Sequence, residues 1–390
     1  MFKKVTILMI LGIFILSPFI VKAQNLEFLE VVKKGTPQQV KKEVIKVKNI
    51  NQKDMFGMTP LMLSAGLNKN PDVIDILIKR GADIKARDMY GKTALDFAAK
   101  YNMNPLIAER LIKNGADVNA RDDKGLTPIM YSVRYNRNPE VTKILIKYGA
   151  NVNVKDKLGI TPLMEAVTGS RDPVIVNLLI DNGADVNACD RNGITPLMRA
   201  ASNNDNPEII KLLIEKGAKI NARSKDGYTA LMRAAGANKN PEITEVLIEN
   251  GAKVNTRNNS GATPLMRAAG FNKNEKVTEI LINNGARVNE RSNDGDTALM
   301  FAAGYNENSK VTAILIDNGA DVNAKNKYGY TPLILAVRYN KNPATIKILL
   351  DNGADVTVKT NTGKTVYDYI KNNSRLRGTK VLKMLEHSKK

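Results

Sequence analysis

Three arginines lie 34 residues apart and have the chemistry to bind an anionic partner: Arg199, Arg233 and Arg267. A guanidinium group can form two parallel hydrogen bonds to one carboxylate, so arginine recognises acidic side chains specifically. The three residues are therefore candidates for binding an acidic segment. The alternative is that they are solvated surface side chains.

Aromatic residues recur at the same spacing on both sides of these arginines. A tyrosine or phenylalanine can act as a rigid apolar anchor for a partner. The alternative interpretation is that the rings pack against one another across neighbouring repeats. The candidates are Tyr101, Tyr135, Phe271, Tyr305 and Tyr339.

Few residues are suited to catalysis. The only histidine, His387, lies in the Lys-rich tail, and Cys189 is the only cysteine, so Cys-His pairs, Ser-His pairs and zinc sites of Cys and His are not expected. Gly91-Lys92-Thr93 lies in a repeat turn and not between a strand and a helix, where a phosphate-binding loop would be. We therefore expect no enzymatic activity, no cofactor and no metal.

All these residues belong to a sequence that repeats every 34 residues, which indicates a stacked array. Within each copy, Thr-Pro and Asn-Pro begin two helices and a glycine such as Gly217 ends the second one. We expect the asparagine after the first helix, as at Asn68, Asn102 and Asn238, to end that helix in the left-handed conformation. The sequence predicts a signal peptide (1–23), an N-terminal capping repeat (24–53), nine 34-residue repeats (54–359), and a C-terminal capping repeat with a basic tail (360–390).

The N-terminus has the features of a leader. Lys3 and Lys4 precede an apolar run, and Val21 and Ala23 are small residues at the −3 and −1 positions of a cleavage site after Ala23. The alternative is an uncleaved membrane anchor. We expect an exported protein, either periplasmic or secreted.

The chain is strongly basic. Its formal charge is +20, and loss of the leader, with Lys3, Lys4, Lys22 and no acid, reduces it to +17. Such a charge favours acidic proteins, polyanions or anionic membrane surfaces as partners. A compositional bias towards lysine is the alternative explanation.

The repeat motif is more specific than its period, which tetratricopeptide repeats share. Thr161-Pro162-Leu163 with Ala166, and residues 183–187 (Gly-Ala-Asp-Val-Asn), resemble ankyrin repeats, and so do the other copies over residues 24–390. The resemblance is to an ankyrin repeat of 34 residues, in a protein that we expect to be exported and bacterial. It implies an all-α repeat solenoid of ankyrin-type helix-turn-helix units with connecting β-turn hairpins. One departure is a methionine in place of the usual histidine, which removes a polar link between neighbouring turns: Met62, Met164, Met198, Met232 and Met266.

The resemblance also implies where partners bind. In the first helix around Arg233, the residues Leu231 and Ala235 share the core face, whereas Arg233 and Ala237 point the opposite way. In ankyrin proteins that outer face and the hairpin tips line a concave groove. We expect a monomeric, non-enzymatic scaffold that binds a protein partner there, and no nucleic acid. The alternatives are a polyanion- or membrane-surface-binding protein and a purely structural envelope protein.

A second basic row follows each Val-Asn pair of the hairpins. The resemblance implies a structural role for this row, because lysine or arginine is common there in the family. The residues are Arg87, Arg121, Lys155, Arg223, Arg257, Arg291, Lys325 and Lys359.

Overall fold

The computed structural model describes residues 23–136, 138–169, 173–371, 373, 376 and 380–387. These residues form 22 helices, α2 to α23, and no strand. The expected all-α repeat fold is therefore confirmed. The chain divides into two units, the first ending at Ala150 and the second beginning at Asn151. The proposed leader, apart from Ala23, lies outside the described residues.

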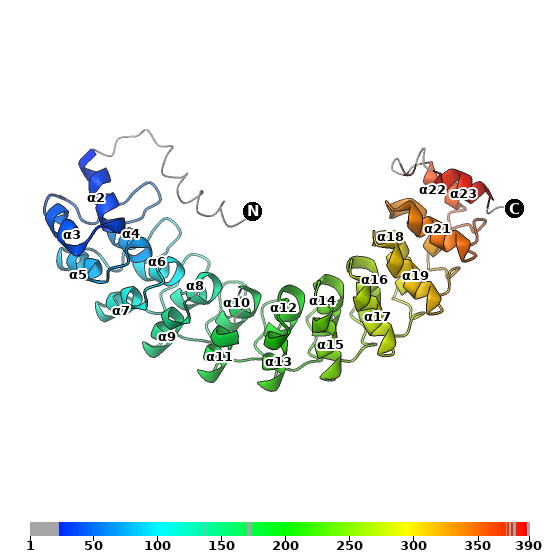
Figure 1. Ribbon diagram of the computed structural model, residues 1–390, viewed down its shortest axis with the longest axis horizontal. Helices are drawn as coiled ribbons and strands as arrows, with labels where there is room; N and C mark the ends of the chain where they lie inside the picture. The colour runs from blue at the N-terminus through cyan, green and yellow to red at the C-terminus, as the bar shows by residue number, and fades with distance from the viewer. Residues whose placement is uncertain are drawn as a thin grey trace. The chain divides into compact units, whose positions relative to one another are not determined.

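The first unit contains a pair of N-terminal helices and three repeats. The N-terminal helices bury Phe28, Val32, Val40 and Val44. The bounds are α2 (Ala23–Lys34), α3 (Pro37–Val44), α4 (Pro60–Leu67), α5 (Asp72–Lys79), α6 (Ala94–Tyr101), α7 (Pro105–Lys113), α8 (Pro128–Tyr135) and α9 (Pro139–Lys147). Within this unit α4, α6 and α8 form one row and α5, α7 and α9 a second (Figure 1).

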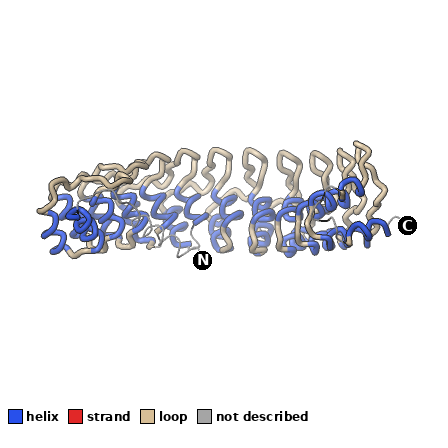
Figure 2. The backbone as a smooth tube through the Cα atoms, turned by 90° about the horizontal axis from the view of Figure 1, so that it is seen from above, coloured by secondary structure: helices blue, strands red, loops and turns tan. Residues whose placement is uncertain are grey.

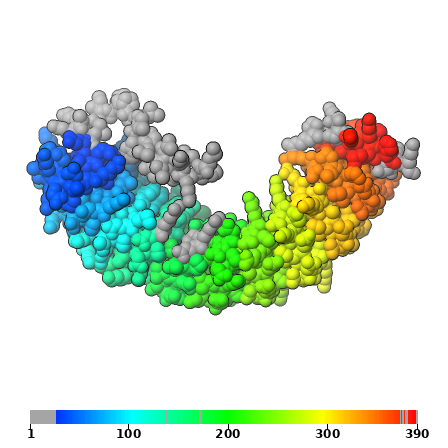
Figure 3. All heavy atoms as spheres, in the orientation of Figure 1, coloured from blue at the N-terminus to red at the C-terminus, as the bar shows by residue number. Residues whose placement is uncertain are grey.

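The second unit continues the same alternation of first and second helices. Its helices are α10 (Pro162–Gly169), α11 (Pro173–Asp181), α12 (Pro196–Asn203), α13 (Pro207–Glu215), α14 (Ala230–Ala237), α15 (Glu242–Glu249), α16 (Pro264–Phe271), α17 (Glu275–Asn283), α18 (Ala298–Tyr305), α19 (Ser309–Asp317), α20 (Pro332–Tyr339), α21 (Pro343–Asp351), α22 (Val366–Ile370) and α23 (Val381–His387). Consecutive repeats of this unit, coloured green to orange, pack directly against one another (Figure 3).

The local signals in the sequence explain the helix bounds. The Thr195 hydroxyl accepts a hydrogen bond from the Met198 amide (3.3 Å), and the Asn206 side chain accepts one from the Glu208 amide (3.0 Å). Both bonds satisfy amides that a helix leaves free at its first turn. Gly217 has φ +90°, so it ends α13 in the left-handed conformation as predicted.

The asparagines after the first helices do not have the predicted conformation. Asn68, Asn102 and Asn238 have extended backbones, with φ between −95° and −79° and ψ between 120° and 136°. They are buried, and their side-chain amides bond to the preceding repeat. Asn238 donates to the carbonyls of Ala201 (3.0 Å) and Asn204 (2.7 Å), and its oxygen accepts from the Asn240 amide (2.9 Å). The asparagine is thus a link between repeats, not a local cap.

This link recurs wherever the position holds a described asparagine, and we call the set the buried asparagine ladder. Each amide donates to a carbonyl 36 or 37 residues earlier. The members are Asn68, Asn102, Asn136, Asn204, Asn238, Asn272, Asn306 and Asn340. Because each carbonyl belongs to the neighbouring repeat, the ladder supplies polar links that do not depend on a histidine.

The methionine in place of histidine has a local role in two repeats. The Thr59 amide donates to the Met62 sulfur, and the Thr263 amide donates to the Met266 sulfur, each over 3.4 Å. Sulfur is a weak acceptor, so these bonds contribute less than a carboxylate would.

The hairpins extend along one side of the helices in each unit (Figure 2). A backbone bond joins successive hairpins, as from the Met89 amide to the Phe56 carbonyl (3.0 Å). The second basic row strengthens this edge. Arg87 donates to the Arg121 carbonyl (2.6 Å) and Arg291 to the Lys325 carbonyl (2.7 Å), so these two arginines have the structural role that the sequence suggested.

No helix among the described residues is both long enough and apolar enough to cross a lipid bilayer.

Candidate functional site

In repeats 1 and 6 the variable side chains meet in a shallow niche between the hairpin and the first helix. We number each repeat from its first residue, so that repeat 1 begins at Asp54 and repeat 6 at Ser224. Such a niche is lined by two groups of positions in its own repeat and by one position of the next. They are hairpin positions 3 and 5, helix positions 9, 10, 13 and 14, and position 10 of the next repeat. The residue types at these positions determine the chemistry of each niche.

Arg199 is neutralised within its own repeat. Its Nη2 lies 2.8 Å from Asp190 Oδ2, and both side chains are largely buried. Asp190 is the first residue of the repeat, and the corresponding residues for Arg233 and Arg267 are Ser224 and Asn258. The three arginines are thus equivalent in position but not in environment.

Arg233 and Arg267 line one pocket of about 220 Å³ in the second unit. Tyr228 lies beside both: the guanidinium carbon of Arg233 is 5.6 Å from the centre of its ring and that of Arg267 is 5.4 Å. Arg267 also lies 4.2 Å from the ring centre of Phe271. Within the described part of the chain, neither arginine forms a salt bridge. Asp226 is the only acid among the residues that line this pocket.

Both arginines are half-buried, and the Nε atom of each is buried without a hydrogen-bond partner in the described structure. Burial lowers the pKa of Arg233, and nearby Arg199 lowers it further, while Asp190 opposes the shift. Arginine nonetheless remains charged at neutral pH. The pocket therefore presents two cations whose charge the protein compensates only in part.

The aromatic candidates of the second unit form a continuous stack. The ring of Tyr305 is 6.3 Å from that of Phe271, at 7° between planes, and 5.8 Å from that of Tyr339, at 24°. The three side chains are 47%, 51% and 43% exposed. They pack across neighbouring repeats, and they also present an apolar ridge to solvent.

Tyr101 and Tyr135 belong to the first unit, where a lysine lies beside both rings. The Lys100 amino group is 4.6 Å from each ring centre. Burial lowers the pKa of Lys100, and Arg134 lowers it further. The described structure brings this pair together as one cluster.

Position 10 is less exposed than helix geometry alone suggested. Tyr131 is buried and its hydroxyl donates to Asp122 Oδ2 (2.6 Å), which together with burial raises its pKa. Leu63 and Glu165 are buried as well. Position 10 therefore lies at the floor of a niche, whereas exposed residues at position 14, such as Leu67 and Tyr101, lie at its rim.

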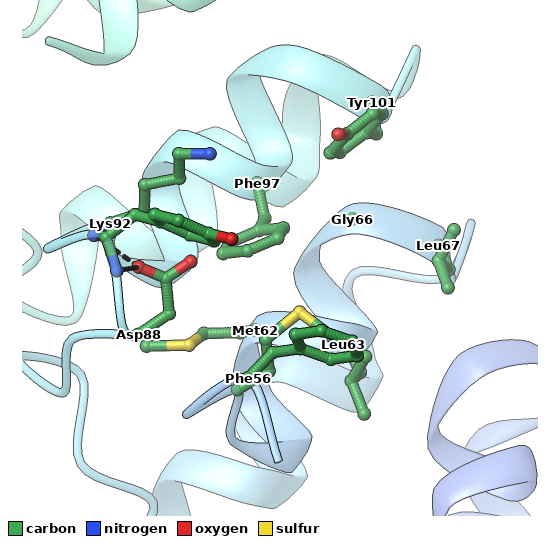
Figure 4. A pocket seen from close by; sticks show the side chains of 11 residues that line it. Phe56, Met62, Leu63, Gly66, Leu67, Asp88, Lys92, Phe97 and Tyr101 are labelled. Atoms are coloured by element: carbon green, nitrogen blue, oxygen red, sulfur yellow. Dashed lines mark hydrogen bonds between the residues drawn. The ribbon is translucent and has the colours of Figure 1, made fainter. Parts of the chain in front are cut away.

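The apolar pocket of the first unit is not among the sites predicted from the sequence. It measures about 270 Å³ and lies between α4, α6 and their hairpins (Figure 4). Its signal was present in the sequence, because positions 3, 5, 10 and 14 of repeats 1 and 2 are apolar or aromatic with the single exception of Lys92. In repeats 1 and 2 these positions hold Phe56, Met58, Leu63, Leu67, Tyr90, Lys92, Phe97 and Tyr101.

Among the described residues, no group of three or more His, Cys, Asp or Glu side chains is placed to hold a metal ion.

Stacked helix pairs with variable side chains along one face define a repeat solenoid, a class of protein that binds partners on an extended surface. The family model for ankyrin repeats (3 copies) matches residues 28–122, 97–190, 170–258, 197–292, 231–326 and 265–360. The chain therefore belongs to the ankyrin-repeat family and is a protein–protein interaction scaffold. Ankyrin repeats are generally interaction modules without catalytic activity. No curated protein matches the chain.

Proposed function

We propose that this protein is an exported scaffold that binds an acidic segment of a partner protein along the niches of its second unit. One observation supports this proposal above the others. Arg233 and Arg267 present partly buried guanidinium groups that no carboxylate pairs with in the described part of the chain.

The surroundings of these arginines favour a carboxylate ligand. The guanidinium group of Arg267 lies near the rings of both Tyr228 and Phe271, and aromatic faces attract a cation. Ionic interactions are stronger in a half-buried pocket than at an exposed surface, because water screens the charges less. Arg199 is already paired with Asp190, so we assign the main binding role to Arg233 and Arg267. The ridge of Phe271, Tyr305 and Tyr339 would then anchor apolar side chains of the same segment.

Export rests on the composition of residues 1–23. Helix α2 begins at Ala23, so cleavage after that residue would leave Phe28 and Val32 in place on the helix. The proposed location is the periplasm or the exterior of the cell.

The binding proposal can be tested with the chain from Gln24 onward and a fluorescently labelled peptide of alternating aspartate and serine. Arg233→Ala should weaken binding about tenfold or more, as expected for a central hot-spot residue, and leave the melting temperature nearly unchanged. Lys253→Ala is the matched control, since it removes the same charge from an exposed side chain outside the pocket. It should change the affinity by less than about twofold.

The polyanion alternative makes a different prediction. If binding depended on net charge alone, Arg233→Ala and Lys253→Ala would weaken it equally, and the affinity would fall steeply with salt as counterions are released. A large loss of thermal stability in Arg233→Ala would instead assign the side chain a structural role. A pull-down from the envelope fraction should recover a partner with an exposed acidic segment.

A further inference from the structure

The apolar pocket of the first unit differs in chemistry from the arginine pocket, although the same repeat positions line both. Position 10 is Leu63 and Phe97 in the apolar pocket, whereas it is Arg233 and Arg267 in the other. The labelled side chains of Leu63, Leu67, Phe97 and Tyr101 surround the open space, as Figure 4 shows. The wall is therefore mostly hydrocarbon and aromatic ring.

The size of this pocket suits a side chain. Small-molecule sites usually measure about 300 to 1,000 Å³, and this pocket is slightly smaller, at about 270 Å³. Its open side faces solvent, because Leu67 and Tyr101 at its rim are both more than 40% exposed. A large apolar side chain such as leucine or phenylalanine would be removed from water on entering the pocket, and this burial stabilises a complex.

The rim of the pocket carries positive charge. Lys92 lines it, with an amino group 5.2 Å from the Tyr90 ring centre, and Lys100 lies beside Tyr101. Neither lysine forms a salt bridge within the described residues. Asp88 also lines the pocket, but it is buried and its Oδ1 accepts hydrogen bonds from the Tyr90 and Lys92 amides (2.8 Å each), so it serves the hairpin. A carboxylate next to the apolar side chain would complement this rim.

We propose that this pocket binds one large apolar side chain of a partner polypeptide, with an aspartate or glutamate next to it held by Lys92. The inference rests on the proposed scaffold function, but it concerns residues of the first unit alone. The chain then has two sites of distinct specificity, one for apolar-acidic sequence and one for acidic sequence.

Gly66 provides a way to close the pocket without disturbing its walls. A Cβ atom built at Gly66 would lie 3.6 Å from Phe97 Cβ and 3.8 Å from Tyr101 Cδ2, which are ordinary contacts. Gly66→Leu should therefore fill the pocket from α4. Gly304→Leu is the matched control, because Gly304 has the same repeat position in the second unit, lines none of these pockets, and its Cβ would meet Leu335 Cβ at 3.6 Å.

The experiment selects a phage-displayed library of random 12-residue peptides on the immobilised chain from Gln24 onward. We expect one enriched group with leucine, methionine or phenylalanine next to an acidic residue. Peptides of this group should bind Gly66→Leu at least tenfold more weakly and Gly304→Leu unchanged. Lys92→Gln should weaken the binding of the same peptides. If the acidic residue of a peptide is replaced with its amide, Lys92→Gln should have a smaller effect on the affinity.

Two further variants separate the outcomes. Leu67→Ser changes an exposed residue at the rim of the pocket. It should also weaken the binding of the apolar-acidic peptides, and it tests the site even if Gly66→Leu alters folding. Arg233→Ala should leave the binding of the apolar-acidic peptides unchanged and abolish only the binding of purely acidic peptides. Failure of one site is therefore distinguishable from failure of the other. A selection without apolar-acidic peptides, or peptides that bind both Gly66→Leu and Leu67→Ser normally, would overturn the proposal.

Discussion

Asp226 is the residue of the arginine pocket that opposes an anionic ligand. It lies at the exposed hairpin position 3, and its charge raises the pKa of Arg233 against the effect of burial. Its carboxylate therefore stabilises the empty pocket and repels an incoming carboxylate.

Asp226→Asn should strengthen binding of the aspartate-serine peptide roughly two- to fivefold, since a charge pair at an exposed site is worth about 0.2 to 1 kcal/mol. Fluorescence anisotropy titrations measure the change. Asp294→Asn alters the same repeat position in repeat 8, outside the pocket, and should have a smaller effect. Equal gains in both variants would indicate a response to net charge only.

Asp96 is a buried carboxyl at position 9, where seven of the nine repeats have methionine. Burial raises its pKa to about 7; hydrogen bonds from the Thr93 amide (2.7 Å) and hydroxyl (2.9 Å) oppose this shift. Of the neighbouring charges, Asp122 raises the pKa further and Arg87 lowers it. Asp96 Oδ1 has no partner in the described structure, so the ionised form is poorly solvated.

Folding should therefore become less favourable as Asp96 ionises. Its pKa is about 3.9 in the unfolded chain and about 7 in the folded one. Its stabilising contribution is complete below pH 4 and is lost as the pH rises through 7, with an upper limit of about 4 kcal/mol. Asp96→Met restores the methionine that most repeats have at this position. The stability of the variant relative to the unsubstituted protein should be greater at pH 8 than at pH 5. Urea unfolding of both proteins at the two pH values measures this, and parallel pH dependences would contradict it.

At the scale of structural elements, the buried asparagine ladder is a recurring polar connection between repeats. Asn238→Ala would leave the Ala201 and Asn204 carbonyls and the Asn240 amide without their partner. We expect a loss of about 2 to 4 kcal/mol, because buried polar groups without partners cost about 1 to 3 kcal/mol each and part of the loss relaxes. Denaturant unfolding is the measurement. Lys239→Ala, the exposed neighbour, should change stability by less than about 0.5 kcal/mol.

Elements could be predicted from the sequence where their signals are local. Thr195, Asn206 and Gly217 act on amides and backbone angles within four residues, so the helix bounds followed directly. The role of Asn238 could not be predicted in this way, because its hydrogen-bond partners are 34 and 37 residues away. A buried asparagine and an exposed C-cap look alike in one repeat. Only the bonds to the preceding repeat distinguish them.

The sequence predicted where the candidate site residues lie in the repeats better than it predicted what surrounds them. The spacing of Arg199, Arg233 and Arg267 placed them at equivalent points of three repeats, but the pairing of Arg199 depends on Asp190, nine residues earlier. The apolar pocket requires hairpin residues such as Phe56 and Tyr90 to reach the first helices. That contact depends on the hairpin geometry, which a helical-face argument does not include.

At the scale of the whole molecule, the formal charge of +20 attracts anions without selecting among them. Selectivity must come from individual niches, where the apolar, cationic and aromatic linings occur at equivalent repeat positions. Raising the salt concentration should weaken every anionic ligand, whereas a single substitution in a niche should weaken only its own ligand.

The leader offers a prediction at this scale. We expect the mature protein to begin at Gln24, since Val21 and Ala23 fit the −3 and −1 positions of a cleavage site. N-terminal sequencing of the protein from its native cells, with its intact mass, measures this. A chain that retains Met1 and sediments with membranes would favour the anchor instead.

The cross-repeat bonds have a consequence for the history of such a chain. The asparagine and hairpin bonds reach only the adjacent copy, with partners 33 to 37 residues apart. A recombination event that adds or deletes one whole copy of the coding segment therefore regenerates these bonds at a new junction wherever the copies hold the asparagine. Lineages can lengthen, shorten or reorder their recognition niches in single genetic steps, without first acquiring compensating substitutions elsewhere.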